Sequence, residues 1–160
     1  KLWESTIILE LSLKRENYTT AFIQFVQLLE QLLYIQSTAQ NWTARGWVVS
    51  NKDEVSLAEL MQGWCLYKKI NQDNKWSKLL KAIRIKRNEI IHKGESITST
   101  KIGDIWANNN FSGVYIPTTS ENIKNLMMEL LKEISTPPNF HNLLMRSLYQ
   151  WGLQYLEDAS

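Results

Sequence analysis

Cysteine is almost absent from this chain, and so are long apolar runs. The single cysteine, Cys65, excludes an internal disulfide. It lies in the apolar run 60–67, so we expect it to pack in the core and not to react. No apolar run approaches the roughly 20 residues of a membrane-spanning helix, and no secretory signal comes first. The sequence therefore predicts a cytoplasmic protein without a membrane segment.

Histidine is also scarce. The two histidines, His92 and His141, have no cysteine or carboxylate at a spacing typical of metal ligands. We expect His141, which follows Pro137-Pro138, to start a helix or lie on the surface. The sequence also lacks a glycine-rich phosphate loop and a nucleophile elbow. These absences predict a chain without a metal site or a cofactor.

Net charge is low, but the basic residues are unevenly distributed. The formal net charge of +2 does not by itself indicate a nucleic-acid partner. Nine of the 18 basic residues nevertheless fall between positions 68 and 93, opposed there only by Asp73 and Glu89. Such clustering is typical of proteins that bind a polyanion, and it is equally typical of a solvated helix face. The cluster comprises Lys68, Lys69, Lys75, Lys78, Lys81, Arg84, Lys86, Arg87 and Lys93.

Hydrophobic periodicity predicts one all-α domain over residues 1–160, with five or six helices. The strongest signal is residues 18–38, whose apolar side chains recur every three or four positions. Ser56 and Glu59 form a capping box before a helix over 57–70. Gly94 is placed to end a helix over 75–93. The other helices are expected at about 2–15, with Trp3, Ile7, Ile8, Leu11 and Leu13 inward, at 120–134, and at 139–157 after Pro137-Pro138.

Two segments carry turn-forming residues in place of helical periodicity. Residues 40–55 predict a connection, with a short strand at 47–49. Residues 95–118 are rich in serine, threonine, asparagine and glycine. They predict a loop or short hairpin inserted after the helix over 75–93, with strands or ordered loop at 102–106 and 114–116.

The segment 86–94 combines an arginine, an amide and a histidine near a helix end. Arg87 interrupts an apolar stripe that includes Ile83 and Ile90. A buried arginine is energetically unfavourable unless a negative group compensates its charge. Asn88 and His92 are four residues apart and so share a face, whereas Arg87 and His92 differ by about 140° around the helix. The same pattern also has an explanation that involves no catalysis. A histidine near a helix C-terminus is favoured by the negative end of the helix dipole, and an arginine can extend out of an apolar stripe into solvent.

The motif Arg87-Asn88-x-x-x-His92 resembles the Arg-x(4–6)-His signature of the HEPN superfamily, which comprises helical nuclease and nucleotide-binding domains. In that signature a polar residue, often asparagine, follows the arginine. The stretch 14–22, running into 27–33, also resembles the opening helical pair of such domains. The resemblance covers about residues 1–95, the core of the domain, and residues 96–160 are expected to form a variable extension.

The resemblance implies a metal-independent endoribonuclease that cleaves single-stranded RNA through a composite active site in a homodimer. His92 would act as general acid or base, Arg87 would hold the scissile phosphate, and Asn88 would orient His92 or donate to the phosphate. The RNA backbone would be approached by Lys81, Arg84, Lys86 and Lys93.

Among HEPN domains, the likeness is greatest to the C-terminal domains of CRISPR-associated ribonucleases, which act in antiviral defence behind a domain that senses cyclic oligoadenylate. The chain begins at Lys1, already in a helical pattern, as expected for part of a longer protein.

Other readings of the same residues stay open. One is a non-catalytic HEPN-like module that binds RNA, a nucleotide or a partner subunit. Another is a toxin ribonuclease of a toxin–antitoxin pair. One such group carries a tyrosine two residues after the histidine, where this chain has Gly94. The last is a helical interaction domain without a nucleic-acid role.

Overall fold

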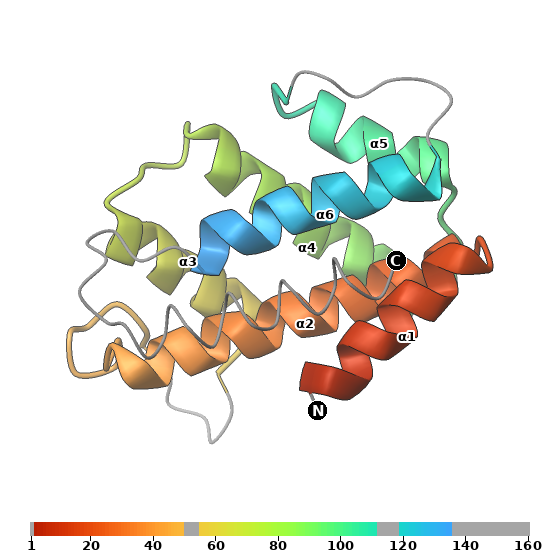
Figure 1. Ribbon diagram of the computed structural model, residues 1–160. Coiled ribbons are helices and arrows are strands. Elements are labelled where there is room, and N and C mark those ends of the chain that lie inside the picture. The colour runs from red at the N-terminus through yellow and green to blue at the C-terminus, as the bar shows by residue number, and fades with distance from the viewer. Residues whose placement is uncertain (1, 50–54, 112–118, 136–160) are drawn as a thin grey trace.

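The structure is a computed structural model, which describes residues 2–49, 55–111 and 119–135 (Figure 1). Six helices form this described part. No strand occurs within these ranges. The predicted all-α fold with five or six helices is therefore confirmed. The helices are α1 (Leu2–Lys14), α2 (Tyr18–Ala39), α3 (Leu57–Lys68), α4 (Lys75–Lys93), α5 (Ser99–Ala107) and α6 (Ser120–Ser135).

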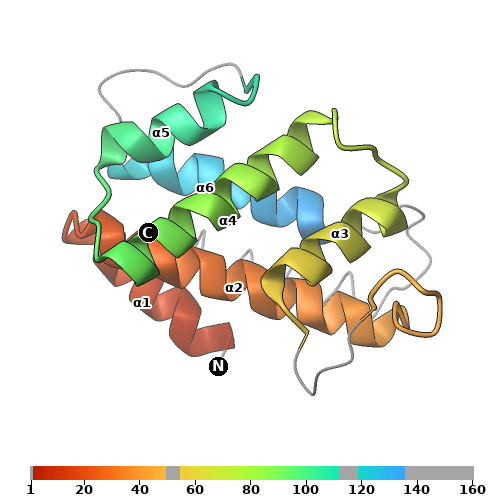
Figure 2. The ribbon, with the colours of Figure 1, turned by 180° about the vertical axis from the view of Figure 1, so that it is seen from behind.

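Helix α2 is the central element. It begins after Asn17, whose side chain accepts a hydrogen bond from Thr20 N, and it continues for 22 residues. It contacts α1, α3, α4 and α6, which are arranged around it in both views of the ribbon (Figures 1 and 2). The predicted apolar stripe is confirmed, because all of its members are buried: Phe22, Phe25, Val26, Leu29, Leu32 and Leu33.

Helix α1 presents a different face to α2 from the one expected. Leu13 is buried as predicted, but Ile7, Ile8 and Leu11 are 40–44% exposed. The inward positions are instead Leu9 and several polar residues. Apolar side chains surround most of this helix, so periodicity alone does not set its rotation. A buried ion pair to α6 favours the observed rotation: Lys124 Nζ lies 3.3 Å from Glu10 Oε2.

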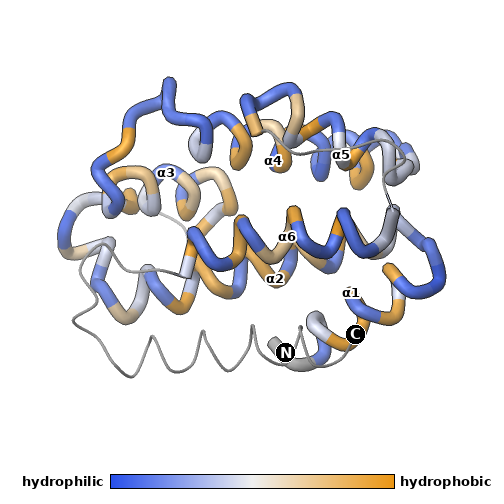
Figure 3. The backbone as a smooth tube through the Cα atoms, turned by 45° about the horizontal axis from the view of Figure 1, so that its top comes forward, coloured by the Kyte–Doolittle hydropathy of each residue, from blue (hydrophilic) through white to orange (hydrophobic). Residues whose placement is uncertain are grey.

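Helix α6 runs beside α2 and completes the core (Figure 3). The helix predicted over 120–134 is confirmed: Ile123, Met127, Leu130 and Leu131 are buried, and Leu126 is half-buried. Both ends are fixed by hydrogen bonds. Ser120 Oγ donates to Leu13 O at 2.8 Å, and Gln36 Nε2 donates to Ile134 O at 2.6 Å. The segment beyond residue 96 therefore contributes to the same hydrophobic core as α2.

The connection between α2 and α3 is well packed without forming a strand. The strand predicted at 47–49 is wrong, because these residues follow a series of turns around buried Trp42. Turn hydrogen bonds, among them Trp47 N to Trp42 O at 2.9 Å, replace sheet pairing. Helix α3 packs closely on this segment because Gly63 has no side chain: an added Cβ would lie 2.8 Å from Trp42 Cε3 and from Val48 Cγ2.

Within the insertion predicted after α4, residues 99–107 form a helix, so the strand or ordered loop expected at 102–106 is wrong. Helix α5 begins after Thr98, whose side chain accepts a hydrogen bond from Lys101 N. Ile102 and Trp106 are fully buried and four residues apart, which is a helical spacing. The turn-rich flanks masked this spacing in the sequence.

Several predictions about other segments lie outside the described residues. These concern the strand or loop at 114–116, Pro137-Pro138, the helix over 139–157 and His141. Within the described residues, no helix has the length and apolar character needed to cross a membrane.

Candidate functional site

Helix α4 carries the candidate site, and its limits match the prediction. Asn74 caps its start by accepting a hydrogen bond from Trp76 N at 2.9 Å. Gly94 ends it in the left-handed region, with φ of 66°, and its N–H donates to Ile90 O. This backbone conformation favours glycine. Helix α4 is held against the core by a buried row comprising Leu79, Leu80, Ile83 and Ile90.

Arg87 and Asn88 form a hydrogen-bonded pair at the C-terminal end of α4. Arg87 Nη1 donates to Asn88 Oδ1 at 3.1 Å, and both side chains are half-buried. Among the described residues, no carboxylate lies within 4.0 Å of the Arg87 guanidinium. A neutral amide accepts from the guanidinium but leaves its full positive charge uncompensated. As far as the described residues go, the charge is therefore available to an anion.

His92 lies one turn beyond Asn88 and is exposed. In the described structure it makes no hydrogen bond to Arg87 or Asn88. Its neighbour Ile91 is 52% exposed. The structure thus brings Arg87 and Asn88 into contact, while His92 stands free at the helix end.

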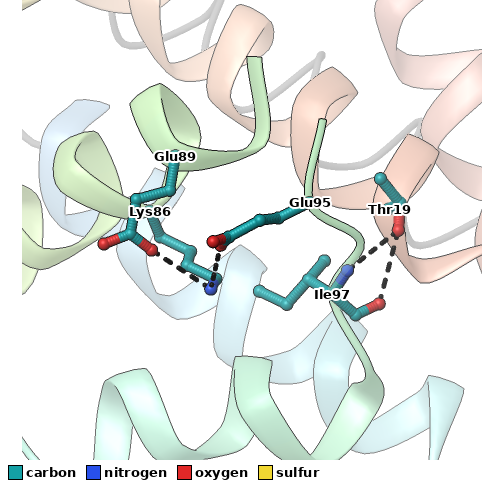
Figure 4. A network of polar contacts seen from close by, with 5 residues as sticks. All are labelled: Thr19, Lys86, Glu89, Glu95 and Ile97. Atoms are coloured by element: carbon teal, nitrogen blue, oxygen red, sulfur yellow. Dashed lines mark hydrogen bonds and ion pairs between the residues drawn. The ribbon is translucent and has the colours of Figure 1, made fainter. Parts of the chain in front are cut away.

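Contacts on the other side of α4 fix the position of this end (Figure 4). Lys86 Nζ lies 3.2 Å from Glu89 Oε2 and 3.4 Å from Glu95 Oε2. Thr19 Oγ1 accepts from Ile97 N at 3.0 Å, which attaches the segment after Gly94 to the start of α2. Burial acts to lower the pKa of Lys86, but hydrogen bonds and attraction from both carboxylates outweigh it, so the net pKa is raised.

A groove between α3 and α4 lies toward the other end of α4. Its volume is about 740 Å³. The basic side chains in its wall are Lys78, Lys81 and Arg84, and Asp73 is its single acidic residue. The apolar part includes Met61, Leu66 and Leu80. The groove also includes Ala58, Gln62, Cys65, Ile70, Asn71, Gln72 and Ser77.

The structure places the four basic residues expected to approach RNA in three different surroundings. Lys81 and Arg84 line the groove. Lys86 is held in ion pairs on the opposite side of α4, about 160° from Asn88 at 100° per residue. Lys93 is exposed at the helix end. Only Lys81 and Arg84 therefore share a face with Asn88.

Sequence reasoning missed the groove, although a signal for it was present. Lys78, Lys81 and Arg84 recur every three residues along α4, and Ala58, Gln62 and Leu66 recur every four along α3. Each series marks one face of a helix. Their pairing across the groove depends on how α3 docks on α4, which periodicity within one helix does not specify.

Among the described residues, no group of three or more histidine, cysteine, aspartate or glutamate side chains is placed to hold a metal ion. Comparison of the chain with protein-family models, with curated proteins and with solved structures gave no match. Inference about function therefore depends on the residues and their geometry.

Proposed function

We propose that this chain is a metal-independent endoribonuclease domain that cleaves single-stranded RNA at the C-terminal end of α4. One observation carries the proposal: Arg87, uncompensated by any carboxylate in the described structure, is joined to Asn88 on a helix end where His92 is exposed. A fixed positive charge beside a group that titrates near neutral pH suits phosphodiester cleavage. The resemblance of this motif to the HEPN signature supports the same reaction.

The Arg87–Asn88 hydrogen bond indicates how these two side chains would act. Because Asn88 Oδ1 accepts from Arg87, the amide NH₂ of Asn88 is left to donate. Two adjacent donors, one of them charged, can hold the non-bridging oxygens of a phosphate and stabilise the charge that develops on them. We therefore assign Asn88 to the phosphate, in preference to a role in orienting His92.

His92 would transfer the protons. The ribose 2′-oxygen attacks the adjacent phosphorus as a base removes its proton, and the bond from phosphorus to the 5′-oxygen breaks as that oxygen receives a proton. The products are a 2′,3′-cyclic phosphate and a 5′-hydroxyl. One histidine supplies one proton-transfer group at a time, and a second copy of the chain would supply the other.

A homodimer is consistent with the surface at this end of α4. His92 is exposed, and Arg87 and Asn88 are only half-buried, so one chain does not enclose the reacting groups. Exposed Ile91 stands beside His92 and offers apolar surface for a partner. A second helix end facing the first would complete a cleft around the phosphate. Action in antiviral defence, an attached sensor of cyclic oligoadenylate and a cytoplasmic location stay predictions from the sequence.

The direct test is cleavage of single-stranded RNA in EDTA by the unaltered chain and by His92→Ala and Arg87→Ala. We expect cleavage without metal by the unaltered chain, and a loss of at least about a hundredfold in each variant. His92 is exposed, so His92→Ala should keep the helical circular dichroism spectrum. Full cleavage by a folded His92→Ala variant, or a strict requirement for a divalent metal, would refute this mechanism.

A second candidate function is a module that binds RNA without cleaving it. It is favoured by the groove, whose basic residues Lys81 and Arg84 lie apart from His92. Binding that persists in His92→Ala, together with no cleavage by the unaltered chain, would support this alternative.

A further inference from the structure

The groove between α3 and α4 is a second feature that the proposed chemistry does not use. Its volume of about 740 Å³ lies within the range of small-molecule sites in proteins. It is formed by two helices that pack against each other and by the turn that joins them, residues 69–74. Its shape is therefore set by the scaffold and does not depend on the residues of the motif.

Charge along one wall of the groove favours an anionic ligand. Lys78 and Lys81 are exposed and Arg84 is half-buried. Within the described residues, none of the three has a carboxylate within 4.0 Å. Two other basic residues of α4 differ, since Lys86 is paired with two glutamates and Lys75 lies over the rings of Trp76 and Phe111. Three uncompensated cations against Asp73 alone leave the groove positive.

The rest of the groove is suited to a flat ring with a polar edge. Met61, Leu66 and Leu80 supply apolar surface, on which a base can stack or pack. The turn at one end supplies Asn71, Gln72 and Asp73, whose amides and carboxylate can pair with the edge of a base. An acidic peptide would use the cations but would supply no ring for the apolar surface. A nucleotide would use the cations, the apolar surface and the polar turn.

The row of polar residues on this face of α4 continues beyond the groove toward the motif. Lys81, Arg84 and Asn88 are spaced three and four apart, so they lie in one row along α4. At 1.5 Å per residue, Lys81 and His92 are separated by about 16 Å along the axis. At about 3.4 Å per stacked nucleotide, that distance corresponds to about five nucleotides.

From these observations we propose that the α3–α4 groove binds nucleotides of single-stranded RNA several positions away from the scissile bond, with the phosphates on Lys81 and Arg84 and a base on the apolar surface. The proposal takes its RNA substrate from the proposed function. Occupancy of the groove can nevertheless be measured without any cleavage, because an oligonucleotide of 2′-O-methyl RNA has no free nucleophile.

Cys65 provides a reporter for occupancy, because it is the only cysteine and it lines the groove. Burial raises the pKa of its thiol, partly offset by a hydrogen bond with Ser77. Alkylation should therefore be followed in mildly alkaline solution, where the thiolate is present. We expect a 2′-O-methyl oligonucleotide of about ten residues to slow the alkylation of Cys65 at least about fivefold at saturation, since it spans the groove and the motif.

Variants on the groove wall should raise the oligonucleotide concentration needed for this protection. Loss of a charged hydrogen bond should weaken oligonucleotide affinity about tenfold in Lys81→Met and in Arg84→Met, and each should lower the slope of log affinity against log salt by about one. Leu66→Asp should weaken affinity by placing a carboxylate on the apolar surface, whereas Leu66→Met should not. Lys101→Met, which removes an exposed charge on α5 outside the groove, is the matched control.

The outcomes separate this inference from the proposed reaction. Protection of Cys65 that depends on Lys81, without cleavage of ordinary RNA, would support the groove and refute the ribonuclease. Cleavage that requires His92, with alkylation unchanged by the oligonucleotide, would support the ribonuclease and refute binding of RNA in the groove. Equal protection by poly-glutamate would overturn the assignment to RNA and indicate an acidic peptide as the occupant.

Discussion

The middle of α4 and its C-terminal end are built from similar residues but differ in how those residues are held. Lys81 and Arg84, near the middle of the helix, have no partner among the described side chains and face a formed groove. Arg87 and Asn88, one turn later, are hydrogen-bonded to each other, half-buried and outside that groove. The first arrangement is suited to binding a flexible polyanion, and the second to holding one phosphate in a fixed geometry.

The largest expected effect comes from changing the charge state of the Arg87–Asn88 pair. Asn88→Asp preserves size but places a carboxylate on the guanidinium, which neutralises its charge and removes the amide donors. We expect the cleavage rate to fall about 10²–10³-fold, the typical cost of losing one donor to a developing oxyanion. The rate constant should be measured at saturating RNA in EDTA.

Affinity is the control for this variant. Because Asn88 does not line the groove, affinity for a 2′-O-methyl oligonucleotide should fall much less than the rate in Asn88→Asp, by about tenfold at most, or about 1.4 kcal/mol. A fall in affinity as large as the fall in rate would show that the middle of α4 and its C-terminal end act as one binding surface.

A smaller effect is expected at the scaffold that shapes the groove. Gly63→Ala would place a Cβ 2.8 Å from atoms of Trp42 and Val48. Such overpacking should lower the free energy of unfolding by about 1–3 kcal/mol. Urea denaturation measures the change, and Gln62→Ala on the exposed face of α3 is the matched control, expected to stay within about 0.5 kcal/mol. Equal stability of Gly63→Ala and the unaltered chain would contradict this account of α3 docking.

The smallest effect is expected at Lys86, which the sequence placed among the RNA-binding residues. Its two ion pairs should make Lys86→Met less stable by under about 1 kcal/mol. Because the pKa of Lys86 is raised in the folded chain, this contribution is complete below its ordinary pKa and is lost as the pH rises through the raised value.

Urea unfolding of Lys86→Met at neutral and strongly alkaline pH measures that difference. RNA affinity should fall less in Lys86→Met than in Lys81→Met. The opposite order would show that Lys86 leaves its glutamates to contact RNA.

The sequence predicted those elements whose signals are local. The limits of α4 follow from Asn74 and Gly94, the capping box of α3 from Ser56 and Glu59, and the stripe of α2 from its own periodicity. It failed where the deciding contact comes from a distant segment. The rotation of α1 depends on Lys124 of α6, and the groove depends on the packing of α3 on α4.

The same distinction applies to the candidate site. The shared face of Asn88 and His92 follows from a spacing of four residues. The hydrogen bond between Arg87 and Asn88 was not predicted, because adjacent residues on a helix do not ordinarily face each other. A long, flexible arginine side chain can turn back to its neighbour, and spacing does not reveal which rotamer it adopts.

The most direct test is one paired measurement on His92→Ala and Lys81→Met: the cleavage rate at saturating single-stranded RNA in EDTA, and the dissociation constant of a 2′-O-methyl oligonucleotide. The account predicts that His92→Ala loses the rate, by about 10²–10⁴-fold, and keeps the affinity. Lys81→Met should lose affinity about tenfold and keep the saturated rate. Loss of the same quantity in both variants, or of neither, would contradict the division of α4 into a binding part and a reacting end.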